Sequence, residues 1–197
     1  MDPHTDTPFL TDRFDDALAY ASRIHRQQVR KVSEVPYVSH LLGVCSIALE
    51  NGADEDQAIA ALLHDAVEDQ GGMARHADIE ARYGARVARL VLQNSDSHSE
   101  PKPPWRERKD AYIAGLSAKP RDALEVAIAD KTHNAGTILQ DLREQGNAVW
   151  ERFTGKREGS LWYYRALADR LAELVPGPGS NRLSRMVTEM ERLAARQ

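Results

Sequence analysis

The sequence predicts an all-α fold, and three observations indicate it. Apolar residues recur three and four positions apart over most of the chain, which is the spacing of a helix face packed against a core. Clusters of glycine and proline, such as Gly71-Gly72 and PGPGS at 176–180, separate these stretches. No segment alternates polar and apolar residues over a sustained length, so strands are not expected. The pattern predicts a bundle of about eight to ten helices.

The predicted helices of the first half begin and end at recognisable signals. Thr11 and Asp54 are residue types that cap helix N-termini, and Asn51-Gly52 is typical of a helix C-terminus. The helix that Asp54 opens is expected to continue as far as Gly71-Gly72. The helices expected here cover about residues 12–29, 37–50, 55–70, 76–83 and 85–93.

The second half begins after a polar, proline-containing stretch, NSDSHSEPKPP at 94–104, which predicts a long loop. Residues 146–159 are expected to be looser than their neighbours. The helical stretches expected here are about 105–117, one opening near Arg121, 133–144, 160–174 and 181–196.

We expect one domain over residues 1–175, with 1–10 as a loose arm, followed by a hinge and an amphipathic helix in 176–197. The last helix has an apolar stripe, which must be covered either by its own domain or by a second copy of the chain. A homo-oligomer is therefore one of two open arrangements. The stripe consists of Leu183, Met186, Val187, Met190 and Leu193.

Composition excludes several classes of function. Lysine and arginine number 26 against 30 aspartate and glutamate, a net charge of −4, so a broadly basic nucleic-acid surface is not expected. The single cysteine, Cys45, excludes an internal disulfide and a metal site made of thiolates alone. No stretch is apolar enough for a membrane span, and the first residues do not resemble a signal peptide. We expect a cytoplasmic protein with neither membrane nor nucleic-acid partners.

Ionisable residues gather near the end of the apolar helix expected at 55–70. His64 and Asp65 are adjacent, and Glu68 and Asp69 each follow one of them by four positions, about one helical turn. Four such groups at the end of an apolar helix are costly to bury unless they bind something. The pattern indicates a ligand or metal site.

Two further residues complete this constellation. His40 interrupts an apolar helix, and Asp130 ends the apolar run ALEVAIAD. Two imidazoles and two carboxylates suit one divalent cation with open coordination positions, which lowers the pKa of bound water. Glu68 and Asp69 are then placed to handle protons.

This combination resembles the HD superfamily of metal-dependent phosphohydrolases, whose pattern is His, His-Asp and Asp on helices. The surrounding segments are similar to the hydrolase domain of RelA/SpoT homologues, and most of all to its stand-alone form, the small alarmone hydrolases. The segments are RKVSEVPYVSH at 30–40, ALLHDAVED at 61–69 and ADKTHNAGTIL at 129–139. The resemblance covers about residues 10–175.

The resemblance implies an HD-domain helical bundle that hydrolyses the 3′-diphosphate of guanosine penta- or tetraphosphate, releasing pyrophosphate and GTP or GDP. One Mn²⁺ per chain is the implied cofactor. The implied metal ligands are His40, His64, Asp65 and Asp130. Glu68 and Asp69 match the acidic pair that activates water, and the implied substrate contacts are Arg30, Lys31, Asn134, Thr137 and Tyr164.

The sequence departs from the RelA/SpoT pattern at three places. Four residues, 32–35, separate Lys31 from Pro36 where three are usual, Leu41 replaces a proline, and Gln70 stands where a threonine is usual. The first departure alters the loop expected to hold the base. Adenosine analogues of the alarmone, NADPH and a nucleoside monophosphate therefore stay open as substrates, as does a nucleotide-binding regulator without turnover.

Overall fold

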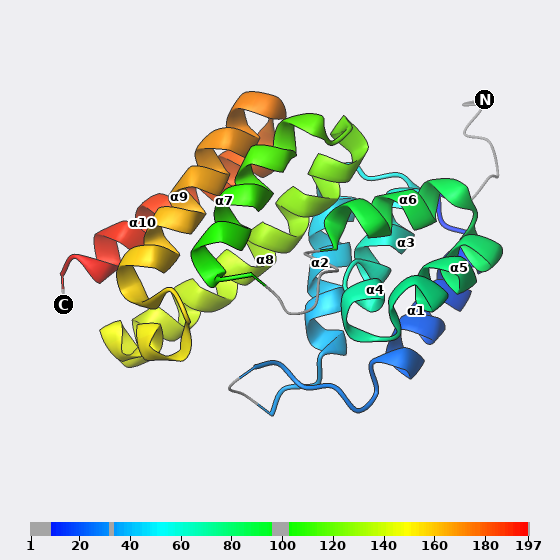
Figure 1. Cartoon of the computed structure of the whole chain (residues 1–197), viewed down its shortest axis with the longest axis horizontal. Helices are drawn as coiled ribbons and strands as arrows, with labels where there is room; N and C mark the ends of the chain where they lie inside the picture. Colours follow the sequence, from blue (N-terminus) through cyan, green and yellow to red (C-terminus); the bar gives the residue numbers. More distant parts are fainter. Residues whose placement is uncertain (1–8, 32–33, 96–102, 197) are drawn as a thin grey trace, which may run out of the picture.

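The structure is a computed structural model that describes residues 9–31, 34–95 and 103–196, and these residues form ten α-helices and two short 3-10 helices (Figure 1). The predicted all-α class is confirmed. Within the described residues the β pairing is an isolated bridge between Val29 and Pro36. In the first half the helices are α1 (Asp12–Ile24), α2 (Val38–Glu50), α3 (Glu55–Leu63), α4 (Ala66–Asp69), α5 (Gly72–Tyr83) and α6 (Ala85–Asn94). In the second half they are α7 (Trp105–Gly115), η1 (Leu116–Ala118), α8 (Arg121–Gln145), η2 (Gly146–Arg152), α9 (Lys156–Leu174) and α10 (Pro178–Ala194).

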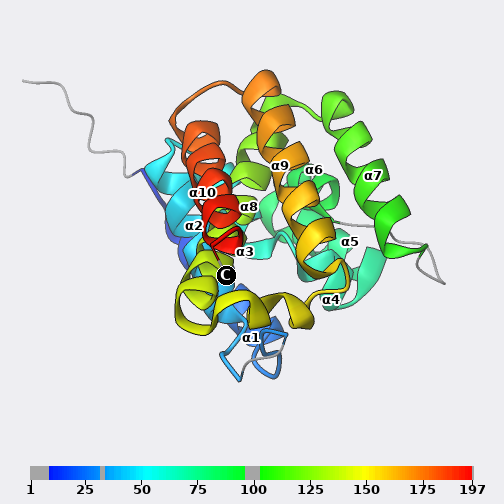
Figure 2. The ribbon, with the colours of Figure 1, turned by 90° about the vertical axis from the view of Figure 1, so that its left-hand side faces the viewer.

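The helices pack into two adjoining apolar cores that share α8. The first core lies among α1 to α6, and the second lies among α7 to α10 (Figures 1 and 2). Ala123, Val126 and Ala129 of α8 belong to the first core, while Ile128 and Leu139 of the same helix belong to the second. Helix α8 therefore serves as a common wall, and a residue on it can face elements from both halves.

The two predicted N-caps are confirmed. The Thr11 hydroxyl accepts a hydrogen bond from the backbone N–H of Arg13. The Asp54 carboxylate accepts from the N–H of Gln57, whose side chain in turn accepts from the Asp54 N–H. This reciprocal pair satisfies donors that would otherwise lack partners at the helix start.

Three of the expected boundaries are wrong in the first half, and one of them is the start of α5, which begins at Gly72 rather than near residue 76. Helix α1 ends at Ile24 rather than near residue 29, because the chain turns where the Gln28 N–H bonds to the His25 carbonyl. The helix expected over 55–70 is two helices, α3 and α4, separated by a turn at His64 and Asp65.

The second half differs from expectation in three places, one of which is α10, which begins at Pro178 within the stretch expected to be a hinge. The helical stretches near Arg121 and over 133–144 are one continuous helix, α8. Within the looser segment, residues 146–152 form a 3-10 helix, and α9 begins at Lys156 rather than at residue 160. The long loop falls largely outside the described residues, as does the N-terminal arm up to residue 8.

Helix α10 packs against α8 and α9 in the same chain. Its residues Leu183, Val187 and Met190 are fully buried in the second core. The sequence left open whether this helix is covered by its own domain or by a second copy of the chain, and in the structure its own domain covers it. A domain boundary at residue 176 stays a prediction.

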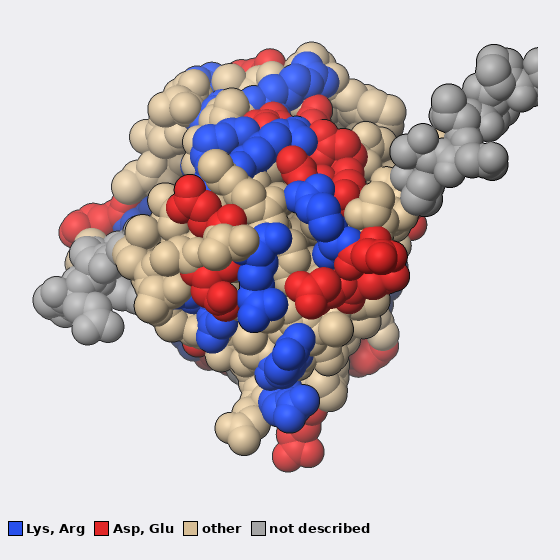
Figure 3. Space-filling model, turned by 90° about the vertical axis from the view of Figure 1, so that its right-hand side faces the viewer, with Lys and Arg blue, Asp and Glu red and all other residues tan. Residues whose placement is uncertain are grey.

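Acidic and basic side chains interleave on the face of the molecule shown in Figure 3. Arg13 of α1 contacts Glu55 of α3 at 2.9 Å within the first half, and Arg89 of α6 contacts Asp122 of α8 at 2.7 Å between the halves. These pairs link helices that are distant in sequence. Among the described residues, no helix is both long and apolar enough to cross a bilayer.

Candidate functional site

Four side chains from separate elements converge beside α8. His40 comes from α2, His64 from the end of α3, Asp65 from the start of α4 and Asp130 from the middle of α8. Possible ligand atoms of His40, His64 and Asp65 lie within 4.8 Å of one another. Asp130 Oδ1 lies 3.3 Å from His40 Nε2 and 3.7 Å from His64 Nε2. The residues expected from the sequence therefore meet at one place.

His64 and Asp65 are consecutive residues in the turn between α3 and α4, and their side chains face the same point. Both residues keep right-handed helical dihedral angles, with φ and ψ of −58° and −30° at His64 and −97° and −2° at Asp65. His64 Nε2 lies 3.0 Å from Asp65 Oδ2.

His64 directs its Nε2 at the carboxylates of the cluster; burial opposes the charged form of the ring, but Asp65 and Asp130 raise its pKa to about 9. Its Nδ1 lies 2.8 Å from the Ala61 carbonyl, which can only accept, so Nδ1 carries the proton. Its Nε2 is buried without a hydrogen-bond partner and faces the carboxylates of Asp65 and Asp130. A lone pair beside two carboxylates is favourable only when a cation, or a proton on the ring, lies among them. The donor set thus fits a divalent cation.

His40 is held by a second histidine. Its Nδ1 lies 2.9 Å from His133 Nδ1, and its Nε2 faces Asp130. If His40 donates its Nδ1 proton to His133, its Nε2 lone pair is left for a metal, the usual arrangement for a ligating histidine. The His133 ring lies against Gly43, where an added Cβ would be 2.1 Å from His133 Cδ2. Glycine is therefore required on α2 for this contact.

The two carboxylates of the cluster receive different support. The Asp65 carboxylate accepts a hydrogen bond from the Tyr37 hydroxyl. Asp130 accepts from Lys131 Nζ at 2.6 Å and from Asn134 Nδ2 at 2.6 Å. Burial opposes ionisation of Asp130, but the Lys131 ammonium and the imidazoles hold its pKa well below the ordinary value. Likewise, burial raises the pKa of Asp65, but the adjacent His64 lowers it further, so both groups are carboxylates.

The acidic pair lies on α4, next to the cluster. Glu68 is half-buried and Asp69 is exposed. Asp69 Oδ2 accepts a hydrogen bond of 2.7 Å from Gln28 Nε2. Although Asp69 is exposed to solvent, partial desolvation by its neighbours raises the pKa of its carboxyl, and the Gln28 amide opposes that rise. The pair thus follows the Asp65 ligand candidate directly along the chain, on the helix that begins after it.

The residues expected to contact substrate are partly brought together. Arg30 Nη2 donates to Asn134 Oδ1 at 2.9 Å, which connects the α1–α2 loop to the cluster through Asp130. Thr137 lies one turn beyond Asn134 and bonds back to the His133 carbonyl. Tyr164 of α9 is partly buried, and burial raises its pKa to about 12. Lys31 is exposed at the edge of the described segment and shows no contact with the cluster.

Two polar side chains at the site were not predicted, namely Tyr37 and Gln28. Each contacts an acidic residue through a hydrogen bond, Tyr37 to Asp65 and Gln28 to Asp69. Both lie on the chain between α1 and α2, where no helical periodicity fixes the direction of a side chain. The Pro-Tyr pair within the 30–40 segment was the available signal, because it lies three residues before His40.

Comparison with known proteins identifies the family of the chain. The family model for the HD domain matches residues 17–161. The chain is 36% identical over 141 residues to a Drosophila melanogaster protein named guanosine-3′,5′-bis(diphosphate) 3′-pyrophosphohydrolase MESH1, covering 70% of this chain and 74% of that protein. The Homo sapiens protein of the same name is 37% identical over 138 residues, covering 68% and 72%.

A solved structure is similar over nearly the whole chain. It covers 95% of this chain and 97% of its own, with a TM-score of 0.73 and 29% identity. That protein is described as a metazoan orthologue of SpoT that hydrolyses ppGpp and plays a role in starvation responses. From the His40, His64, Asp65 and Asp130 cluster, the matched family and these relatives, we conclude that the chain belongs to the HD domain family, with the MESH1 proteins and the metazoan SpoT orthologue among its relatives.

Proposed function

We propose that this protein is a metal-dependent phosphohydrolase that removes the 3′-diphosphate of guanosine tetra- or pentaphosphate as pyrophosphate. The observation that carries the proposal is the convergence of two imidazoles and two carboxylates around the unpartnered Nε2 of His64, with an acidic pair on the next helix. The names of the similar proteins support the choice of substrate.

The metal would be held by His40, His64, Asp65 and Asp130, and we propose Mn²⁺. Nitrogen and oxygen donors together suit a cation of intermediate hardness. When bound, such a cation supplies Lewis acidity to phosphate oxygens and lowers the pKa of water. Tyr37 and His133 orient two of the proposed ligands, Asp65 and His40, through hydrogen bonds.

The acidic pair would manage the protons of the reaction. Water attacks the phosphorus attached to the ribose 3′-oxygen. The bond between that phosphorus and the 3′-oxygen breaks, and pyrophosphate departs. The attacking water loses a proton and the ribose 3′-oxygen gains one, so an acceptor and a donor are both needed. Glu68 and Asp69 of α4 are the carboxyl groups that we assign to these two transfers.

Positive and polar groups near the cluster would bind the nucleotide. Arg30 contacts Asn134, and its guanidinium lies 5.9 Å from the centre of the Tyr37 ring. A planar guanidinium can pair with phosphate or stack on a base, which an ammonium does less well. We propose Arg30, Asn134, Thr137 and Tyr164 as substrate contacts, with Lys31 at the outer edge.

Product analysis tests this proposal. The purified protein is incubated with Mn²⁺ and one nucleotide at a time. The nucleotides are guanosine tetraphosphate, its adenosine analogue, NADPH and a nucleoside monophosphate. We expect pyrophosphate and GDP from guanosine tetraphosphate, at a higher kcat/KM than for the other three. Mg²⁺ and Zn²⁺ in place of Mn²⁺ test the choice of metal.

Each other outcome points elsewhere. Orthophosphate from NADPH or from the monophosphate would identify a different phosphatase. Faster release of pyrophosphate from the adenosine analogue would show a preference for adenine over guanine, while the proposed reaction would stand. Tight binding of a nucleotide without any product would favour a regulator.

A further inference from the structure

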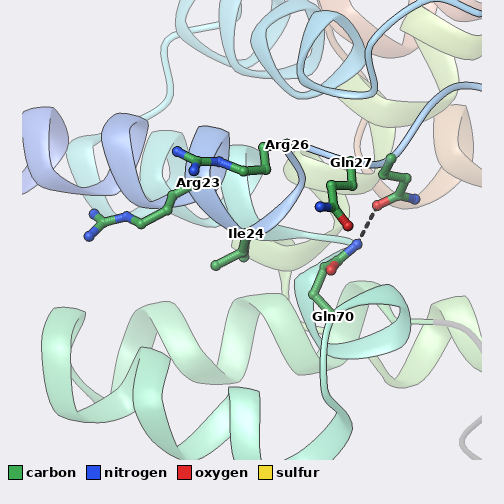
Figure 4. Close-up of a pocket in the computed structure, with 6 residues that line it drawn as sticks. Arg23, Ile24, Arg26, Gln27 and Gln70 are labelled. Carbon is green, nitrogen blue, oxygen red and sulfur yellow. Dashed lines mark hydrogen bonds between the residues drawn. The ribbon is translucent and has the colours of Figure 1, made fainter.

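The side-chain amide of Gln28 links three groups. Its Nε2 donates to Asp69 Oδ2 at 2.7 Å. Its Oε1 lies 2.6 Å from Gln70 Nε2 and 2.6 Å from His25 Nδ1. Figure 4 shows Gln70 reaching across to this amide, at the edge of a surface hollow of about 360 Å³ that both glutamines line.

Hydrogen-bond chemistry fixes the orientation of this amide. The Asp69 carboxylate can only accept, so it must face the NH₂ end of Gln28 rather than the oxygen. The oxygen then accepts from Gln70 and from the Nδ1–H of His25. Burial lowers the pKa of His25, so the ring is neutral and its one proton is on Nδ1, which leaves an acceptor at the buried Nε2.

The backbone around Gln28 is fixed as well. Its N–H donates to the His25 carbonyl at 2.9 Å, and its carbonyl accepts from the Tyr37 N–H at 2.9 Å. The His25 ring also stacks on the Tyr37 ring, with centroids 5.4 Å apart. The amide therefore rests on a support whose position does not depend on Asp69.

Asp69 needs such support because it lies near solvent at the end of a four-residue helix. An exposed carboxylate at a helix end samples several rotamers, whereas proton transfer requires it within hydrogen-bond distance of the reacting group. A charge-assisted hydrogen bond from a fixed amide selects one rotamer. It occupies Oδ2 and leaves Oδ1 for the reaction.

We propose that Gln28, held by His25 and Gln70, is a positioning residue that orients the Asp69 carboxylate for proton transfer. This inference rests on the role proposed above for Asp69. In this arrangement Gln70 holds the oxygen end of the Gln28 amide through its own Nε2.

Kinetics of matched leucine variants test the inference. Gln28→Leu keeps the size of the side chain and removes its polar atoms. It should lower kcat about 10- to 100-fold, the cost of a misplaced catalytic group, while KM stays within about twofold and manganese content is unchanged. Gln27→Leu, one residue away on the same hollow, should leave kcat unchanged. Gln70→Leu should cost less than Gln28→Leu, since His25 still contacts the amide.

A double-mutant cycle separates positioning from general damage. In the Asp69→Asn background, Gln28→Leu should cause no further loss of kcat, because the group that it positions is already inactive. An equal loss in both backgrounds, or wild-type kcat for Gln28→Leu, would overturn the inference.

A spectroscopic measurement tests the contact without turnover. The side-chain amide resonances of Gln28 in a ¹⁵N-labelled protein are assigned by their loss in Gln28→Leu. They should shift in Asp69→Ala and stay in place in Glu68→Ala. Resonances that do not move in Asp69→Ala would refute the contact. A wild-type protein that hydrolyses none of the nucleotides would count against the proposed function, while this spectrum would still decide whether Gln28 contacts Asp69.

Discussion

The two cores contribute differently to the candidate site. Around the first core, α2, α3 and α4 supply His40, His64 and Asp65, together with the acidic pair on α4. Around the second core, α9 and α10 supply apolar side chains that pack on α8. Asp130 stands on the helix that both cores share. The proposed metal ligands lie mainly around the first core, whereas the second core mainly stabilises α8. Substitutions around the first core should therefore change metal content and turnover, and substitutions in the second core should change the free energy of unfolding.

The largest effect is expected at Asp65. Asp65→Asn removes one negative charge from the proposed metal ligands, and should abolish manganese retention and with it turnover, while the fold is kept. Metal content after dialysis and the circular dichroism spectrum are the measurements. An Asp65→Asn protein that holds manganese as well as wild type would remove Asp65 from the ligand set.

A chemical effect without loss of metal is expected at Glu68. Glu68→Gln should lower turnover by about two to four orders of magnitude, the usual contribution of a general acid or base. Manganese content should equal that of wild type. Steady-state rates and metal content are measured on the same sample. Near-normal turnover at full metal content would make Glu68 a bystander.

Support without chemistry is expected at Leu183. This fully buried residue of α10 packs in the second core. Leu183→Ala should lower the free energy of unfolding by about 2–5 kcal/mol. Denaturant titration, manganese content and a sizing column are the measurements. Unchanged metal content and elution volume would agree with a second core that supports the fold without shaping the metal site. Loss of manganese in a folded variant would show that the second core shapes the metal site.

A loss of stability and a loss of metal affinity should combine at Gly43, where α2 of the first core lies against His133 of α8. In Gly43→Ala the new Cβ forces the His133 ring away, because the two would be 2.1 Å apart. We expect a loss of about 1–3 kcal/mol of stability and a 10- to 100-fold weaker manganese affinity, by roughly the factor that outer-shell partners contribute.

Gly115→Ala is the matched control for Gly43→Ala. Nothing lies within 4 Å of the added Cβ at Gly115, at the end of α7. Its stability should be unchanged or about 0.5–1 kcal/mol higher, because alanine favours helix. Equal behaviour of the two variants in calorimetry and in metal titration would contradict the role of His133.

The smallest effect is expected at an acidic residue that is paired with arginine. Asp122 contacts Arg89 at 2.7 Å and Arg86 at 3.5 Å, at the start of α8. Asp122→Asn should cost about 1 kcal/mol or less, since such pairs are partly exposed. Manganese content and turnover should not change. A larger loss of activity would mean that the position of α8 depends on this ion pair.

The sequence was informative wherever periodicity or capping decides the structure. The stripe of α10 and the caps at Thr11 and Asp54 depend on neighbours within one turn, and the structure agrees with them. His40, His64, Asp65 and Asp130 could be selected because ionisable residues interrupt apolar helices at these points.

The remaining features depend on contacts between distant segments. The turn between His64 and Asp65 breaks a helix that has good local propensity throughout, so no short-range pattern indicates it. Likewise, the directions of Gln28 and Tyr37 are set by hydrogen bonds from the α1–α2 loop to α4. A pattern within one element cannot contain that information.

The sharing of α8 has a consequence for unfolding. This helix has 25 residues, about 37 Å of length, and contributes side chains to the interior on both of its sides. If either half unfolds, it exposes apolar side chains of α8 to water, because the other half covers a different side of that helix. We therefore expect a single cooperative transition, with equal calorimetric and van't Hoff enthalpies, and similar hydrogen-exchange protection in α3 and in α10.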